Sequence, residues 1–201
     1  HELRNPLAPL MNAVKILQRS ARLADAERTV VAAADRQVRQ MTRLVDDLLE
    51  VSRITRGTIT LKPELIDVND TAAAAVNTVA QAALAKGIKL EVALPQAALR
   101  IQADPVRIAQ VLENLLNNAI KFTPRAGRIE LVVRDAGDAV ELCVTDNGRG
   151  IAHENIERIF NLFEQADMSL DRSFGGLGIG LALVKRLVDL HHGGVSAHSD
   201  G

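Results

Sequence analysis

The sequence predicts two units of different fold class: a helical hairpin over residues 1–56 and, over residues 57–201, a sheet with helices on one face. Leucine and valine repeat at heptad spacing in the first unit, whereas helical and strand-like segments mix without regular alternation in the second. The two units also differ in net charge. Residues 1–56 hold ten Lys and Arg against seven Asp and Glu, and residues 57–201 hold fourteen against eighteen.

The composition excludes several classes of function. Among 201 residues only four are aromatic, all of them Phe, although 47% of the chain is apolar. This argues against carbohydrate-binding modules and against RNA readers that stack bases on aromatic rings. The single cysteine, Cys143, excludes a disulfide framework and a cysteine-based zinc site. A net charge of −1 gives no reason to expect nucleic acid as a partner.

The apolar segments are too short to cross a bilayer, and no signal peptide is visible. We therefore expect a cytoplasmic fragment that makes no membrane contact, with anchorage of the full-length protein left open. Because the chain starts with His1 and stops at Gly201, we interpret it as a piece of a longer protein.

Two heptad seams predict the helices of the first unit, with a break near residues 20–25. The first seam is spaced 4, 3, 4, 3 and the second 3, 4, 3, 4, 3; their members are Leu3, Leu7, Leu10, Val14 and Leu17, then Val31, Ala34, Val38, Met41, Val45 and Leu48. A single hairpin has too little core to stand alone, so we predict a homodimer that forms a four-helix bundle.

The heptad register places His1 on the outside of the first helix. With Leu3 at position d, His1 falls at b, Glu2 at c and Asn5 at f, all away from the seam. An exposed imidazole beside a carboxylate is a candidate nucleophile with a proton acceptor next to it. This local pattern by itself favours an ordinary solvated histidine, and only the second unit changes that balance.

Caps, breakers and periodicity predict the elements of the second unit. We expect, in chain order, a strand over 58–61, a helix over 70–86, a strand over 88–94, a helix from Asp104-Pro105 to Phe122, a hairpin of strands 128–134 and 139–145, a short helix over 155–160, a helix over 179–191 and a final strand after Gly193-Gly194.

Asparagines gather on one face of the helix that ends at Phe122. Asn114, Asn118 and Lys121 are spaced i, i+4, i+7, and Asn117 borders them. Amide oxygens suit a hard cation such as Mg²⁺, and a lysine suits phosphate. The alternative is a solvated helix face, but asparagine costs several tenths of a kcal/mol relative to alanine inside a helix.

Two glycine-containing segments complete the candidate site. Asp146-Asn147-Gly148-Arg149-Gly150 follows a strand, where Asp146 can accept a hydrogen bond from a ligand amine; an ordinary turn is an equal alternative. Gly175-Gly176-Leu177-Gly178-Ile179-Gly180 opens a helix, which suits an anion. Its spacing fits neither the dinucleotide fingerprint nor a Walker A loop.

Taken together, five motifs in order resemble the bacterial sensor histidine kinases across essentially the whole chain. They are the H box His1–Leu7, the N box Asn114–Lys121, the first glycine box Asp146–Gly150, the F box Ile159–Gln165 and the second glycine box Gly176–Gly180. The resemblance implies a dimerisation and histidine phosphoacceptor hairpin, then a GHKL-type ATP-binding domain. That domain is an α/β two-layer sandwich with a mixed sheet and a lid, here with a truncated C-terminal strand.

The resemblance also assigns roles to matching residues. His1 would be the phosphoacceptor, Glu2 would take its proton, and Asn5 would orient water for dephosphorylation of the partner. Asp146 would bind adenine, Asn114 and Asn118 would hold Mg²⁺, and Lys121 would contact phosphate. Backbone at five glycines would line the nucleotide and close the lid: Gly148, Gly150, Gly176, Gly178 and Gly180.

The four phenylalanines lie in the second unit, and we expect Phe160, Phe163 and Phe174 to anchor the lid, with simple core packing as the alternative. The implied reaction uses Mg²⁺ and ATP to phosphorylate His1 and then an Asp of a response-regulator receiver domain. Two alternatives are a nucleotide-binding signalling scaffold without transfer activity, and a GHKL ATPase or serine kinase. The second is disfavoured because Asn114 stands where ATP-hydrolysing relatives carry a carboxylate.

Overall fold

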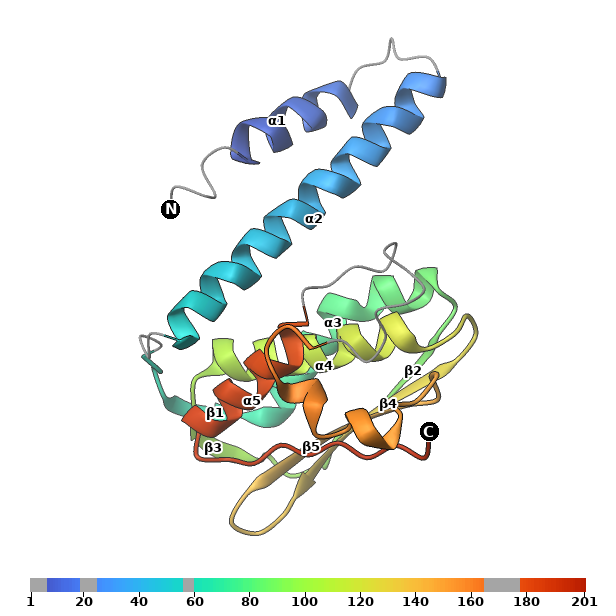
Figure 1. The fold of residues 1–201 in the computed structure, drawn as a ribbon. Helices are drawn as coiled ribbons and strands as arrows, with labels where there is room; N and C mark the ends of the chain where they lie inside the picture. The colour runs from blue at the N-terminus through green and yellow to red at the C-terminus, as the bar shows by residue number, and fades with distance from the viewer. Residues whose placement is uncertain (1–6, 19–24, 56–59, 165–177) are drawn as a thin grey trace. The chain divides into compact units, whose positions relative to one another are not determined.

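The computed structural model describes residues 7–18, 25–55, 60–164 and 178–201, and the chain divides into two compact units, His1–Thr58 and Ile59–Gly201 (Figure 1). Each unit is described by itself. The H-box residues His1, Glu2 and Asn5, together with Gly176 and Phe174, lie outside the described residues.

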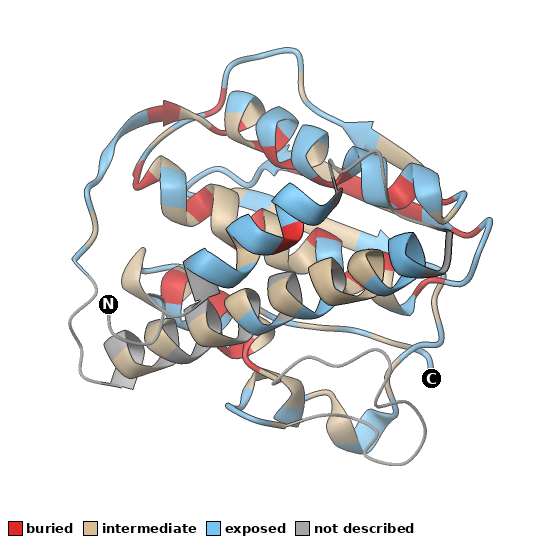
Figure 2. Cartoon of the chain, turned by 90° about the horizontal axis from the view of Figure 1, so that it is seen from above, coloured by how far each residue is buried: buried red, intermediate tan, exposed pale blue. Residues whose placement is uncertain are grey.

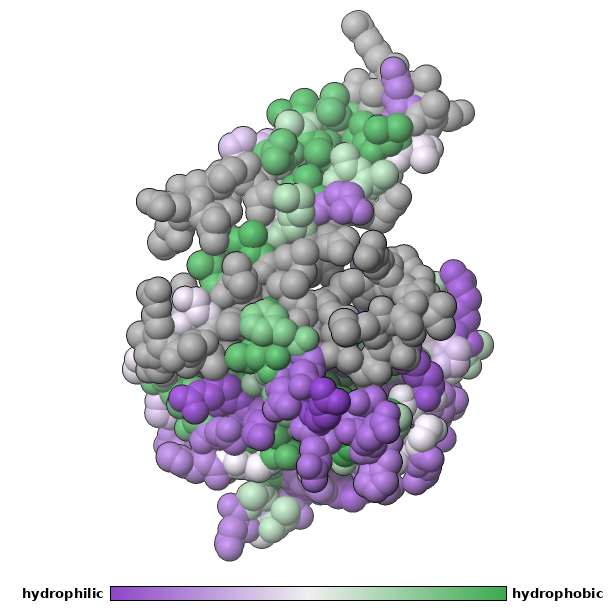
Figure 3. All heavy atoms as spheres, in the orientation of Figure 1, coloured by the Kyte–Doolittle hydropathy of each residue, from purple (hydrophilic) through white to green (hydrophobic). Residues whose placement is uncertain are grey.

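The first unit contains the two predicted helices, α1 (Leu7–Gln18) and α2 (Asp25–Thr55), which pack side by side. Val14 is buried between them, and the Thr42 hydroxyl lies 3.6 Å from the sulfur of Met11. Other members of the seams stay exposed, with Leu10 at 51% and Met41 at 50%. Apolar side chains accordingly show on the surface of these helices (Figure 3).

The second unit is a two-layer sandwich, as the resemblance implies. Its main sheet has the order β2-β4-β5, in which β2 (Lys89–Ala93) runs parallel to β4 (Arg128–Asp135) and β4 antiparallel to β5 (Val140–Asp146). The sheet is therefore mixed. A second, antiparallel pair joins β1 (Glu64–Asp67) to β3 (Arg100–Ala103).

Three helices cover one face of the main sheet: α3 (Val68–Ala85), α4 (Pro105–Phe122) and α5 (Gly180–Leu190) (Figures 1 and 2). Strand β4 alternates as a half-covered strand should, with Ile129, Leu131 and Val133 buried toward the helices. The matching face of α4 is apolar and buried, and consists of Ile108, Val111, Leu112, Leu116, Ala119 and Ile120.

Three predictions about elements are corrected. Thr60 and Leu61 are not in a strand; the first strand is β1, which starts at Glu64 because it pairs with β3, a strand that local pattern did not reveal. The short helix is two 3₁₀ turns, η1 (His153–Asn155) and η2 (Arg158–Phe160). Residues 193–201 form no strand, since the described backbone offers them no ladder partner.

Asp104, a buried residue, forms hydrogen bonds with three segments of the second unit. Asp104 is only 6% exposed and caps α4, where its Oδ1 accepts from the N–H groups of Val106 (3.1 Å) and Arg107 (3.2 Å). Its Oδ2 accepts from the N–H of Lys62 at 2.9 Å. Its own N–H donates to Nε2 of His191, just beyond α5, at 3.1 Å.

The electrostatics of this cap favour the charged carboxylate. Burial by itself would raise the pKa of Asp104, but the N–H donors of Lys62, Arg107 and Val106 and the charge of Arg107 outweigh it, so the pKa is lowered.

Replacing Asp104 with alanine should lower the free energy of unfolding at neutral pH by about 1–3 kcal/mol, through loss of the cap and of the Lys62 bond. The folded pKa lies below the unfolded value of about 3.9, so this stabilisation is complete above that value and is lost as the pH falls through the folded pKa. Urea unfolding of wild type and variant should therefore converge in acid. An equal effect of Asp138→Ala, on the exposed hairpin loop, would contradict the assignment.

Candidate functional site

The polar face of α4 is the centre of the candidate site, and its orientation follows from the burial of the opposite face. Asn114 and Asn118 are both half-buried. Nδ2 of Asn114 donates to the carbonyl of Gln110 at 2.9 Å. Because a carbonyl can only accept, the amide is oriented with Oδ1 away from Gln110. An oxygen acceptor is thus presented beside α4.

Helix α5 begins directly against these asparagines. A Cβ on Gly180 would lie 3.1 Å from Oδ1 of Asn114 and 3.8 Å from Nδ2 of Asn118. The first distance is tighter than an ordinary van der Waals contact, so only glycine fits without a shift of Asn114. The structure therefore brings Gly180 of the second glycine box against Asn114 of the N box.

The loop after β5 packs closely against the C-terminal end of α4. Oδ1 of Asp146 accepts from the N–H of Gly148 at 2.8 Å, which forms an Asx turn. A Cβ on Gly148 would lie 2.8 Å from the carbonyl oxygen of Phe122, the last residue of α4. Asp146 itself is exposed, so its carboxylate remains accessible to a ligand.

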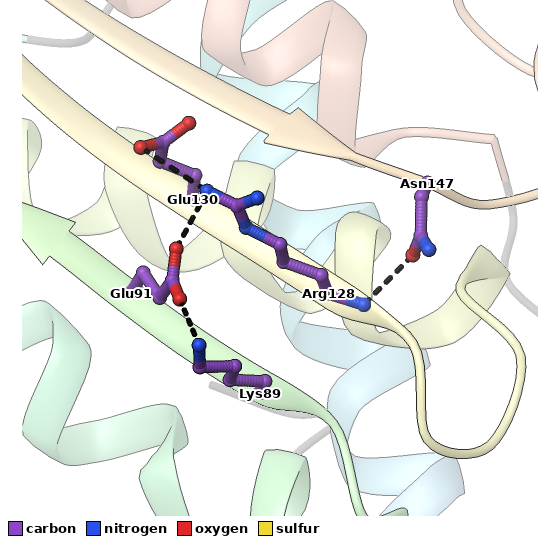
Figure 4. Close-up of polar contacts among 5 residues, drawn as sticks. All are labelled: Lys89, Glu91, Arg128, Glu130 and Asn147. Carbon is purple, nitrogen blue, oxygen red and sulfur yellow. Dashed lines mark hydrogen bonds and ion pairs between the residues drawn. The ribbon is translucent and has the colours of Figure 1, made fainter.

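Asn147 fixes this loop to the sheet. Its Oδ1 accepts from the N–H of Arg128 at 2.7 Å (Figure 4). Its own N–H donates to the Arg128 carbonyl at 3.2 Å. The Arg128 guanidinium pairs with Glu91 at 2.6 Å across β2 and β4, and Lys89 pairs with the same carboxylate. Sequence reasoning gave Asn147 no role, although an amide beside a strand end is a usual signal for a loop bond.

Close packing against the C-terminal segment, which the sequence did not predict, explains why position 150 is a glycine. Its φ is +71°, and a Cβ would lie 2.6 Å from both the carbonyl carbon and oxygen of Gly201. Next to it, the N–H of Ile151 donates to Oγ of Ser199 at 2.9 Å. The C-terminal segment therefore already requires glycine here, and the nucleotide-lining role of Gly150 stays a prediction.

A backbone hydrogen bond joins the F box to the second glycine box. The N–H of Phe163 donates to the carbonyl of Gly178 at 3.2 Å, and a Cβ on Gly178 would lie 2.6 Å from the carbonyl oxygen of Glu164. Gly178 has a φ of +69°, and Phe163 has one of +66°, which is uncommon for a bulky residue and costs about 1–3 kcal/mol. Phe163 is also 57% exposed, so its ring is not part of the core.

Two cations lie against one aromatic ring at the end of α4. Nζ of Lys121 and the guanidinium carbon of Arg149 are each 4.8 Å from the centre of the Phe122 ring. Burial, and then the charge of Arg149, lower the pKa of Lys121. Phe122 is 38% exposed. Sequence reasoning assigned no chemistry to Phe122 or Arg149.

The donors present fit a magnesium ion better than a softer metal. Within the described parts of the chain no group of three or more His, Cys, Asp or Glu side chains could hold a metal. The Asn114 amide oxygen and the neighbouring Asn118 amide are hard donors, of the kind that Mg²⁺ takes together with water and phosphate oxygens. Both predicted metal residues are thus adjacent in space.

Two family models match the chain in succession. The His Kinase A (phospho-acceptor) domain matches residues 1–57, and the histidine kinase-, DNA gyrase B- and HSP90-like ATPase matches residues 103–201. The chain belongs to the sensor histidine kinases. The fold class and the family resemblance are confirmed, and the second unit of this histidine kinase core is an ATP-binding domain.

Relatives of the histidine kinase core are longer proteins. The circadian input-output histidine kinase CikA of Synechococcus elongatus is 34% identical over 203 residues, which cover 99% of this chain and 27% of CikA. The non-motile and phage-resistance protein of Caulobacter vibrioides is 43% identical over 160 residues, which cover 78% of this chain and 19% of that protein. The chain therefore spans about a fifth to a quarter of these relatives.

Among solved structures, full-length ShkA in complex with AMPPNP matches with a TM-score of 0.80 at 29% identity, over 99% of this chain and 42% of ShkA. In the described residues of the present chain, no helix combines the length and apolarity that crossing a membrane requires.

A methyl group at Gly180 should weaken Mg-ATP binding without unfolding the domain. Moving the Asn114 side chain off its position costs about 0.5–1.5 kcal/mol, so affinity should fall about two- to tenfold in Gly180→Ala. Alanine also favours a helix over glycine, so the unfolding free energy should hold or rise. Gly194→Ala, where a Cβ meets nothing within 4 Å, is the matched control. Calorimetric titration that gave both variants the wild-type affinity would disprove the contact.

Phe163→Ala separates a lid role from core packing. Alanine keeps the strain of a positive φ and removes only the exposed ring, so the melting temperature of the nucleotide-free protein should hardly change. Nucleotide affinity should fall about three- to tenfold if the ring anchors the lid. Leu84→Ala, at a 78% exposed site on α3, is the control. Lower stability with unchanged affinity would instead make the ring a packing residue.

Proposed function

We propose that the chain is the catalytic core of a two-component protein-histidine kinase, which phosphorylates His1 from Mg-ATP and passes the phosphoryl group to an Asp of a response-regulator receiver domain. The observation that carries this proposal is the convergence of the N box and both glycine boxes on α4. Gly180 abuts Asn114 at one part of the helix, and Gly148 abuts Phe122 at its end.

Different residues on this surface would bind different parts of ATP. Asp146 is accessible to accept from the adenine amine, and Lys121 supplies a positive charge for the phosphates. Asn114 and Asn118 would hold Mg²⁺, which would neutralise charge on the triphosphate. The ATP-binding assignment is supported by the AMPPNP carried by the solved relative ShkA.

In the transfer step the attacking nucleophile is a histidine side chain and not a water molecule. An imidazole nitrogen of His1 forms a bond to the γ-phosphorus, the bond from that phosphorus to the bridging oxygen breaks, and ADP leaves with the electron pair. Glu2 accepts the proton that the imidazole releases, and the receiver Asp later takes the phosphoryl group from His1. Asn5 orients a water for the reverse regulation, dephosphorylation of the partner.

Hydrolysis of ATP, the reaction of the ATPase alternative, finds less support. A water-activating base must be able to take a proton, and the Asn114 amide cannot. Its Nδ2 is also engaged with Gln110. A nucleotide-binding scaffold without transfer activity remains the alternative that activity measurements must separate, since it would bind ATP equally well.

The first unit supplies the surface for a second copy. Leu10 and Met41 are members of the heptad seams that a single chain leaves exposed, and a homodimeric four-helix bundle would bury them. We assign the working location to the cytoplasm, where ATP and the receiver domain are found.

Incubation with γ-labelled ATP and Mg²⁺, in protein with its natural flanking sequence restored, should label wild type but not His1→Gln. The label should be acid-labile and alkali-stable, as expected for phosphohistidine. His198→Gln removes an exposed imidazole at the other end of the chain and should label normally. Label that persisted in His1→Gln would falsify the phosphoacceptor assignment, and ATP binding without any label would support the scaffold.

A further inference from the structure

A two-point ion pair joins the beginning of the F-box segment to its end. Arg158, the first residue of η2, donates from Nε to Oε2 of Glu164 at 2.9 Å and from Nη2 to Oε1 at 3.3 Å. A planar guanidinium matches a carboxylate in this geometry, so the pair holds both side chains in one orientation. The contact spans six positions of the chain, and the segment between its two ends contains Phe160 and Phe163.

Stabilisation of a helix does not explain this pair. Ion pairs that support a helix join residues three or four positions apart on its surface. The turn η2 ends at Phe160, so Glu164 lies outside it. Exposed ion pairs with loose geometry contribute little to stability, but the Glu164 side chain is only 32% exposed and is held at two points. The pair therefore acts on the chain that follows η2.

That part of the chain has a backbone conformation that needs support. Phe163 has a φ of +66°, which bulky residues rarely adopt. Its N–H donates to the carbonyl of Gly178 at 3.2 Å, and the carbonyl oxygen of Glu164 lies 2.6 Å from the place where a Cβ of Gly178 would be. The ion pair of Glu164 adds a side-chain restraint directly next to the strained residue.

The backbone against which the F box rests is itself anchored in the core. Ile179 is buried and lies between Gly178, which contacts the F box, and Gly180, which abuts Asn114. The restraints on Phe163 therefore set the position of the F box relative to the asparagine face of α4. The Phe163 ring is more than half exposed, which leaves it accessible to a bound molecule.

We propose that Arg158 is a positioning residue of the nucleotide site, which acts through Glu164 to hold the Phe163 ring where a bound nucleotide meets it. The proposal rests on the ATP-binding function proposed above and deepens it, because it names a residue that sets nucleotide affinity without touching the nucleotide.

Hydrogen exchange of the Phe163 N–H in the nucleotide-free full chain tests the structural half of the proposal. Arg158→Gln should lower the protection factor of this amide about two- to fivefold, as expected for loss of a well-aligned exposed ion pair. Arg158→Glu combined with Glu164→Arg reverses the polarity of the pair and should recover most of the protection. High salt should lower protection in wild type but not in Arg158→Gln.

Calorimetric titration with Mg-ATP tests the functional half. Arg158→Gln should weaken binding about two- to fivefold, and the charge-reversed pair should restore it. In a Phe163→Ala background Arg158→Gln should cause no further loss, because the ion pair acts through that ring. Arg134→Gln, which breaks the exposed pair with Glu141 on the hairpin, is the matched control and should leave protection and affinity unchanged.

Unchanged protection of the Phe163 amide in Arg158→Gln would overturn the proposal. Lower protection with wild-type affinity, or losses that add to those of Phe163→Ala, would reduce the pair to a purely structural contact and refute the positioning role. If wild type itself fails to bind Mg-ATP, the proposed function fails together with the positioning role, whereas a failure confined to Arg158→Gln leaves the proposed function intact.

Discussion

Burial of one face of α4 is the constraint on which the rest of the second unit depends. Leu112 and Leu116 are fully buried, so the helix has one favourable rotation about its axis, and a helical period then fixes where every other residue points. Asn114, Asn118 and Lys121 stay outside the core as a consequence. Their mean cost as interior helix residues is small beside the about 1.5–3 kcal/mol gained by each buried leucine. The apolar core therefore determines the placement of the polar site.

Glycines set how closely the other segments approach this helix. Gly180 brings α5 against Asn114, and Gly148 brings the β5 loop against the Phe122 carbonyl. Each approach uses space that a single methyl group would fill, so both junctions depend on backbone shape rather than on side-chain bonds. At Gly150 the same reasoning points to Gly201 instead of a ligand. A glycine in a motif can thus serve the fold, the site or both, and only the neighbouring atoms distinguish these roles.

Helix caps and short-range sequence patterns predicted the helices and strands whose positions depend on neighbouring residues. Asp104-Pro105 located the start of α4, and the alternation of 128–134 and 139–145 located the hairpin, because caps and period-two patterns act within a few residues. The pair β1 and β3 escaped prediction since each strand has four residues and is defined by a partner more than thirty positions away. The site divides in the same way. Residue type and spacing suggested Asn114, Asn118 and Asp146 as candidates. The contact of Arg149 with Phe122 and the bond of Asn147 to Arg128 could not be suggested in this way, because folding brings these residues together.

The arrangement also gives a reason why the proposed site would hold ATP without hydrolysing it. Water attack on the γ-phosphorus needs a group that removes a proton, yet the amide nearest to α5 is neutral and donates its hydrogen to Gln110. Positive charge of the kind that Lys121 would supply stabilises phosphates in ground state and transition state alike, so by itself it would favour binding more than reaction. The barrier then falls only when a nucleophile is brought to the γ-phosphate from elsewhere. The phosphoacceptor histidine proposed for the helical unit would meet this requirement, because its approach could be regulated independently of nucleotide binding.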